Sequence, residues 1–249
     1  MSEPLTFGSL FAGIGGFDLG FERAGMVCKW QVEIDDYANR VLRKHWPDVR
    51  RWPDVRTWPQ PDTERVDVIC SGFPCQDISY AGLGAGIQGE RSGLFFEAVR
   101  VVRQLKPRIL VLENVAALLT RGMDAVLGTL AAIGYDAEWE SLPASAFGCY
   151  HERDRVFIVA YKQGAVSGVF GQSRAEWQAQ FKHRRLASSS QARAVERFGD
   201  RMEGEPDVAC LVHGVSDGLG RGLGNAVVPQ VAEYVGRMVV ERLKGLQDE

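Results

Sequence analysis

The residue best suited to covalent chemistry in this sequence is Cys75, which lies in the stretch SGFPCQDIS over residues 71–79. Pro74 stiffens the chain directly before the thiol, and the mostly apolar run from Val66 to Cys70 precedes both. A thiol becomes a strong nucleophile when a neighbouring cation or a helix N-terminus favours its ionised form. Two interpretations stay open here: Cys75 is a nucleophile held at a fixed angle, or a small residue buried in a turn. Cys70, inside the apolar run, is interpreted as core.

Glycines form a second candidate site in Phe11-Ala12-Gly13-Ile14-Gly15-Gly16, between an expected strand and an expected helix. Glu33 ends the next expected strand, about 20 residues on, where an acid commonly accepts hydrogen bonds from a ribose. Because glycines let the backbone approach a ligand closely, the pair predicts a nucleotide-type cofactor. It does not separate a nicotinamide cofactor from S-adenosylmethionine. Asp54 is either a contact for an adenine amino group or a solvated loop acid.

Two further groups of polar residues lie beside apolar runs. Glu113-Asn114-Val115 ends the run RILVLEN, and ligands of open parallel sheets bind at the carboxyl ends of strands. Glu113 is therefore a candidate site residue, with a helix cap as the alternative. The stretch 151–155, HERDR, precedes another apolar run, and its charges alone favour a turn with local salt bridges.

Strand-like and helix-like segments alternate along the first 160 residues or so and must position these groups. Apolar runs predict strands near residues 5–10, 26–34, 66–70, 108–114 and 156–161, and helical spacing predicts helices at 17–24, 35–46, 94–105 and 123–135. This alternation predicts an α/β fold with a doubly wound, mostly parallel sheet. Residues 225–245 recover helical periodicity and are expected to pack back onto this unit. The echo WPDVR at 46–50 and 52–56 is interpreted as loop.

Composition excludes several classes of protein. Five cysteines without a CxxC pair argue against a disulfide framework or a structural zinc, and four scattered histidines predict no metal site. The start MSEPLTFGSL lacks the features of a signal peptide, and no run of about 18 apolar residues predicts a membrane span. We therefore expect a cytoplasmic protein. The net charge of −3 argues against a chain that coats nucleic acid along its whole surface.

The segment from 163 to about 218 differs from the rest in being polar, irregular and basic. Between Ala165 and Arg201 it holds seven basic residues against three acidic ones, a local charge of +4. Such a segment is either a phosphate-facing surface or a solvated insertion.

The order of these motifs resembles the C5-cytosine-specific DNA methyltransferase family. The glycine turn, the acid, GFPCQDIS, ENV, Arg-x-Arg and a final GLGNAVVPQ occur in that order, over roughly residues 1–162 and 219–245. The resemblance implies a Rossmann-like catalytic, cofactor-binding domain made of 1–162 and 219–249. Residues 163–218 would form a short target-recognition region.

The resemblance also assigns roles to residues of this sequence. Cys75 matches the nucleophile, and Glu113, Arg153 and Arg155 match residues that hold the target cytosine. The S-adenosylmethionine site would be lined by Phe11, Gly13, Gly15, Glu33, Ile34, Asp54, Asn225 and Ala226. DNA contacts are expected from Gln76, Ser79, Arg91, Arg184 and Arg185, with 76–93 as a lid over a flipped-out base.

The implied activity is methyl transfer from S-adenosylmethionine to carbon 5 of cytosine in double-stranded DNA, through a covalent adduct with Cys75 and with S-adenosylhomocysteine as product. The enzyme would be a monomer of a restriction-modification or related system. Its recognition region is short for the family, so a separate specificity partner is one possibility. The alternatives are a tRNA cytosine-5 methyltransferase on the same fold, a non-catalytic DNA-binding relative, and a nicotinamide-dependent oxidoreductase.

Overall fold

A single seven-stranded sheet organises the part of the chain that the computed structural model describes, residues 3–74, 93–149, 152–163, 169–170 and 226–245. The strand order is β3-β2-β1-β4-β5-β7-β6. Strands β1 to β5 pair in parallel, whereas β7 is antiparallel to both of its neighbours, β5 and β6. The bounds are β1 Thr6–Leu10, β2 Val27–Val32, β3 Arg50–Trp52, β4 Val68–Ser71, β5 Ile109–Val115, β6 Tyr135–Pro143 and β7 Asp154–Lys162. The predicted doubly wound, mostly parallel α/β fold is confirmed.

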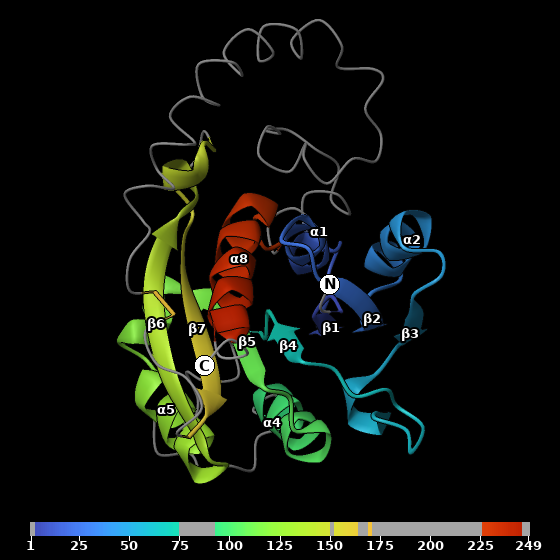
Figure 1. The fold of residues 1–249 in the computed structure, drawn as a ribbon, viewed down its shortest axis with the longest axis horizontal. Helices are drawn as coiled ribbons and strands as arrows, with labels where there is room; N and C mark the ends of the chain where they lie inside the picture. The colour runs from blue at the N-terminus through green and yellow to red at the C-terminus, as the bar shows by residue number, and fades with distance from the viewer. Residues whose placement is uncertain (1–2, 75–92, 150–151, 164–168, 171–225, 246–249) are drawn as a thin grey trace, which may run out of the picture.

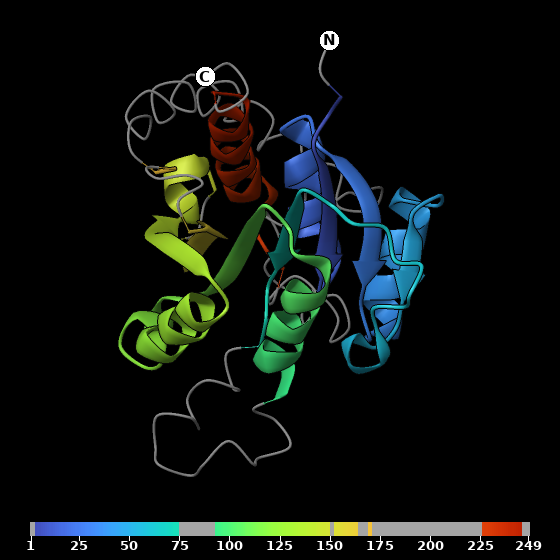
Figure 2. The same cartoon turned by 60° about the horizontal axis from the view of Figure 1, so that its bottom comes forward.

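Helices cover both faces of this sheet (Figures 1 and 2). Helices α1, α2 and α8 lie on one face, and α4 and α5 lie on the other. Their bounds are α1 Gly16–Arg23, α2 Asp36–His45, α4 Gly93–Leu105, α5 Met123–Ala132 and α8 Pro229–Gly245, with short 3-10 turns η1 Val55–Thr57, η3 Ala116–Leu119 and η4 Ala144–Phe147. None of the helices in the described ranges is long and apolar enough to cross a membrane.

The central strands are apolar on both faces because each face is covered. In β5 the residues from Ile109 to Leu112 are all buried, and in β4 the Cys70 side chain is fully buried, as expected for core. Burial raises the pKa of the Cys70 thiol well above its ordinary value, so this sulfur is not a nucleophile. The chemistry of the molecule must therefore lie at the ends of these strands.

Helix α8 packs directly against α1, although the two are separated by most of the chain (Figure 1). The helices approach so closely that a Cβ placed at Gly20 would lie 2.5 Å from the Cβ of Ala232. This contact holds residues 226–228, which lead into α8, beside the turn that follows β1. The carboxyl ends of the parallel strands meet at that same edge of the sheet.

Two strands were missed by the apolar pattern. Strand β3 runs from the last residue of the first WPDVR copy, Arg50, to the first residue of the second, Trp52, so the interpretation of that whole stretch as loop was wrong. Strand β6 is an edge strand whose residues are mostly exposed or half-buried, so it carries no apolar run. Its acids recur at every second position, Asp136, Glu138 and Glu140, and this period of two was the signal available.

Candidate active site

Glu33 is the anchor of the glycine turn between β1 and α1. One carboxylate oxygen accepts a hydrogen bond from the Gly13 backbone N–H at 2.7 Å, and the other accepts from the Asp35 N–H at 2.8 Å. Asp35 in turn caps α2 by accepting from the Ala38 N–H at 2.8 Å. The acid therefore ties the turn to the start of α2, and its expected contact with a ribose stays a prediction.

The turn leaves an open space beside its backbone. Gly13 and Gly15 have φ values of +55° and +92°, which favour glycine, and a Cβ built at Gly13 would meet no atom within 4 Å. Phe11 also has a positive φ, 52°, which is uncommon for a residue with a side chain. Ile34, next to Glu33, is 64% exposed.

These groups fit an adenosine-type cofactor. Each oxygen of the Glu33 carboxylate keeps a second lone pair that can accept from a ribose hydroxyl. The exposed Ile34 side chain offers an apolar surface to a purine ring, and the space beside Gly13 admits a ligand close to the backbone.

A network of mostly buried polar side chains connects α1 with β1, β2 and β3 next to the glycine turn. Asp18 of α1 is fully buried and accepts from Ser9 Oγ at 3.2 Å and from Gln31 Nε2 at 2.8 Å. Gln31 accepts from Arg51 Nε at 2.7 Å, and the Arg51 guanidinium donates to backbone carbonyls of α2 at Leu42 and Trp46. Burial raises the pKa of Asp18 to about 6, against the lowering effect of these hydrogen bonds. Sequence reasoning missed this network.

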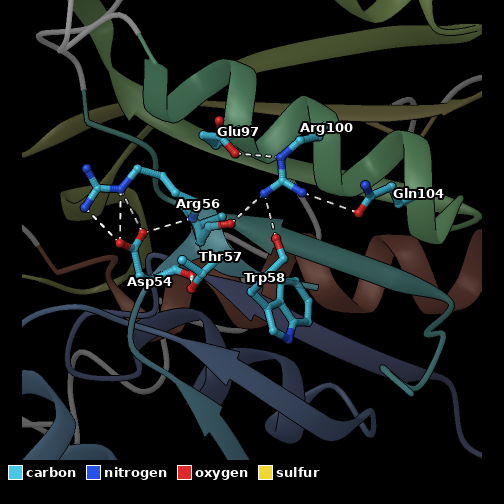
Figure 3. A network of polar contacts seen from close by, with 8 residues as sticks. Asp54, Arg56, Thr57, Trp58, Glu97, Arg100 and Gln104 are labelled. Atoms are coloured by element: carbon cyan, nitrogen blue, oxygen red, sulfur yellow. Dashed lines mark hydrogen bonds and ion pairs between the residues drawn. The ribbon is translucent and has the colours of Figure 1, made fainter. Parts of the chain in front are cut away.

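Asp54 lies in the loop after β3, where it caps the η1 turn (Figure 3). The Asp54 carboxylate accepts bidentate hydrogen bonds from Arg56, from Nη2 to Oδ2 at 2.8 Å and from Nε to Oδ1 at 3.0 Å. Arg56 holds the pKa of Asp54 below its ordinary value. Arg100 of α4 donates to the carbonyls of Val55 and Trp58 at 2.7 and 2.6 Å, which fixes the turn against the core. The expected adenine contact of Asp54 stays a prediction.

Glu113 lies at the carboxyl end of β5 and is buried. Its Oε1 lies 3.1 Å from Arg155 Nε in an ion pair, although the geometry falls short of a hydrogen bond for that oxygen. Burial raises the pKa of Glu113 from 4.5 to about 7, while Arg155 and Arg153 oppose the rise. The side chain is therefore partly protonated near neutral pH. Such a carboxyl group can donate a proton as well as accept one.

Arg153, two residues before Arg155, reaches a different partner. Its Nη2 donates to the Ala226 carbonyl at 2.9 Å, across 73 residues of sequence. Ala226 is buried and packs with Ile14 of the glycine turn and Ala38 of α2. Ala226 thus lies beside the glycine turn, and its expected contact with the cofactor stays a prediction.

Asn114 holds the chain that leads to Cys75. Its Nδ2 donates to the Phe73 carbonyl at 3.0 Å, and its Oδ1 accepts from the Val115 N–H at 2.8 Å. Phe73 is itself buried and stacks on Phe95 of α4, with ring centroids 5.2 Å apart. The Asn114 side chain therefore fixes β5 to the segment after β4 through Nδ2, while its Oδ1 is used within β5. Asn114 was quoted within the ENV motif but given no role, although a buried amide at a strand end requires partners.

The structure brings Glu113, Arg153 and Arg155 together, and it joins Gly13 to Glu33. The remaining predicted residues lie outside the described residues: Cys75, Gln76, Ser79, Arg91, Arg184, Arg185, Asn225 and most of the expected lid at 76–93. Within the described ranges, no group of three or more His, Cys, Asp or Glu side chains is placed to hold a metal ion.

Comparison with known proteins agrees with this arrangement. The family model for C-5 cytosine-specific DNA methylases matches residues 5–209, most of the chain. The chain belongs to the C-5 cytosine-specific DNA methylase family. Type II methyltransferase M.Eco47II of Escherichia coli is 35% identical over 167 residues, which cover 64% of this chain and 40% of that protein. M.HhaI of Haemophilus parahaemolyticus is 30% identical over 162 residues, 64% of this chain and 49% of its own length.

The chain thus spans less than half the length of these DNA methylase relatives. Solved structures extend the likeness of fold over more of it. The Dnmt2 methyltransferase of S. pombe superposes with a TM-score of 0.65 at 16% identity, covering 95% of this chain and 99% of that chain. An E. coli prophage protein assigned as a DNA modification methyltransferase gives a TM-score of 0.62 at 18% identity, covering 96% and 99%.

Proposed function

We propose that this protein transfers a methyl group from S-adenosylmethionine to carbon 5 of a cytosine flipped out of duplex DNA. The observation that carries the proposal is the Glu113–Arg155 pair at the carboxyl end of β5, in which Glu113 is buried and its carboxyl pKa is raised to about 7. A carboxylic acid that is protonated near neutral pH, with a guanidinium beside it, suits the N3 and carbonyl oxygen of one pyrimidine ring. Membership of the DNA methylase family supports the same reaction.

Glu33 and the glycine turn would bind the cofactor. The carboxylate would accept from the ribose hydroxyls, and Ile34 would contact the adenine. When bound, S-adenosylmethionine supplies an electrophilic methyl group on its sulfonium and leaves as S-adenosylhomocysteine. Residues 226–228 would close the same site from the far end of the chain.

Cys75 would begin the reaction as a thiolate. Its sulfur forms a bond to carbon 6 of the ring, and the electron pair of the C5–C6 double bond then makes carbon 5 nucleophilic. Protonated Glu113 donates to ring N3, and Arg155 donates to the carbonyl oxygen, so both stabilise the charge that develops. After carbon 5 takes the methyl group, its proton leaves to solvent and the S–C6 bond breaks, which regenerates the thiolate. Ring N3 returns its proton to Glu113. Asn114 supports the step by fixing Phe73, two residues before Cys75.

The proposal also assigns separate roles to two parts of the chain. Residues 1–162 and 219–249 would form the catalytic, cofactor-binding unit, and 163–218 would read the DNA sequence, with Arg184 and Arg185 on phosphates. Gln76, Ser79 and Arg91 would contact the DNA around the flipped base.

The test is transfer of labelled methyl groups from S-adenosylmethionine to two substrates, duplex DNA of mixed sequence and a tRNA pool. We expect label in duplex DNA, recovered as 5-methylcytosine after digestion, and none with Cys75→Ser. Label in tRNA alone would identify an RNA methyltransferase. Binding of S-adenosylhomocysteine without any transfer, and without a covalent adduct on 5-fluorocytosine DNA, would identify a non-catalytic relative.

A further inference from the structure

Val227 lies between the two halves of the candidate site. On one side its backbone touches the cofactor turn, where a Cβ placed at Gly16 would lie 2.1 Å from the Val227 carbonyl oxygen. On the other side its Cγ2 would lie 3.6 Å from a Cβ placed at Gly72, a position that is also 3.5 Å from Glu113 Oε2. One residue near the end of the chain is therefore in reach of both the glycine turn and the surroundings of the catalytic carboxyl group.

Arg153, the residue before β7, contacts this region from the side of the expected cytosine site. Arg153 Nη2 donates to the carbonyl of Ala226, the residue just before Val227. Arg155, two residues further, turns to Glu113 instead. Arg153 thus donates to residues 226–228, here named the closing segment, whereas Arg155 forms the ion pair with Glu113. Both arginines also act electrostatically on that carboxyl group.

We propose that Arg153 is a positioning residue, which fixes the closing segment and so couples cofactor binding to binding of the cytosine. This inference rests on the proposed function, and it changes the role expected for Arg153 from holding the base to holding the chain. The guanidinium holds Ala226 against Ile14 and Ala38, and it thereby holds Val227 against Gly16. The position of the closing segment then affects both the glycine turn and the surroundings of Glu113.

The coupling has a defined size and direction. Loss of a hydrogen bond from a charged donor should weaken ligand binding by roughly ten- to a hundredfold if the ligand needs the closing segment in place. Because linkage is reciprocal, DNA that engages the base site should tighten cofactor binding by the same factor by which cofactor tightens DNA binding. Removal of the Arg153 contact should reduce both effects together.

The experiment measures the affinity of S-adenosylhomocysteine by calorimetry for the wild type, Arg153→Met, Arg153→Lys and Arg155→Met. Without DNA, we expect Arg153→Met to raise the Kd about tenfold or more and Arg153→Lys to restore part of the loss, because lysine can still donate to one carbonyl. Arg155→Met should bind within twofold of wild type, since its partner is Glu113. With a duplex that the wild type methylates, the gain in affinity should shrink in Arg153→Met.

Hydrogen exchange gives a readout that needs no ligand. The amides of Val231 and Ala232 donate to the Val228 carbonyl at 3.1 and 3.0 Å, so they report on the closing segment. We expect faster exchange of these amides in Arg153→Met and not in Arg155→Met. Unchanged exchange, or wild-type affinity for S-adenosylhomocysteine in Arg153→Met, overturns the inference while the proposed function stands. A wild-type protein that binds no S-adenosylhomocysteine overturns the proposed function itself.

Discussion

The carboxyl groups in the two halves of the candidate site differ in the hydrogen bonds that they accept from the protein. In the cofactor half, both oxygens of Glu33 accept backbone N–H groups, and both oxygens of Asp18 accept side-chain donors. In the base half, Glu113 is buried beside Arg155, and its Oε1 lacks a well-formed hydrogen bond. The carboxyl group proposed to bind the cofactor thus accepts hydrogen bonds from the protein, whereas the one proposed to act on the base has a buried oxygen without a hydrogen bond.

This contrast carries an energetic meaning. Buried polar atoms without a hydrogen bond cost free energy. The raised pKa of Glu113 expresses that cost, because burial destabilises the charged form more than the arginines stabilise it. Substitutions in the two halves should therefore separate turnover from ligand affinity.

The largest expected effect breaks the base half alone. Cys75→Ser should lower the rate of methyl transfer by more than about a thousandfold, because a hydroxyl is a far weaker nucleophile than a thiolate. Affinity for S-adenosylhomocysteine should stay close to wild type, as measured by calorimetry. Loss of that affinity in a folded variant would contradict the separation of the two halves.

Glu113→Gln should lower kcat by about a hundredfold or more, because the amide cannot transfer a proton. The wild-type rate should fall as pH rises above about 7, since the protonated fraction of Glu113 decreases there. The variant should lose this alkaline decline, which a pH profile of single-turnover rates would measure. A profile with the same decline in the variant would assign it to another group.

Glu33→Gln tests the half of the site that is expected to bind the cofactor. We expect the Kd for S-adenosylhomocysteine to rise about ten- to a hundredfold, because the hydrogen bonds of a charged acceptor are weakened or lost. At saturating cofactor, kcat should change much less than in Glu113→Gln. Glu241→Gln, at an exposed position of α8, is a matched control that should leave both parameters unchanged. An equal loss of kcat in Glu33→Gln would show that the acid also serves the reaction.

Asp18→Asn should have the smallest effect on activity and a clear effect on stability. Burial raises the pKa of Asp18 in the folded state from 3.8 to about 6. The protonated side chain therefore stabilises the native state below about pH 4, and this stabilisation is lost as pH rises to about 6. The loss amounts to at most about 3 kcal/mol. The variant should lack it and should be at least as stable as wild type at pH 8, as measured by urea unfolding across this range. A steeper pH dependence in the variant would contradict this account.

Sequence patterns predicted the elements that are buried on both faces and failed for those that are not. β5 and β7 carry apolar runs because helices cover them, and Glu113 was expected at the site because it ends such a run. β6 is half exposed and alternates acids instead of apolar residues, so no run marked it. The contacts of Asn114 and of Gln31 with Arg51 join residues far apart in sequence, and no local pattern encodes such partners. Arg153 and Arg155 look alike in the sequence, and only the fold shows that they turn to different partners.

The packing of α8 against α1 has a consequence for the order of events during synthesis. The glycine turn is translated well before residues 226–228, which lie against it in the folded protein. A polypeptide that stopped before residue 226 would lack this contact and the Arg153 hydrogen bond to Ala226. Under the proposed function, such a polypeptide should bind the cofactor weakly until residues 226–245 have been made and α8 has packed on α1.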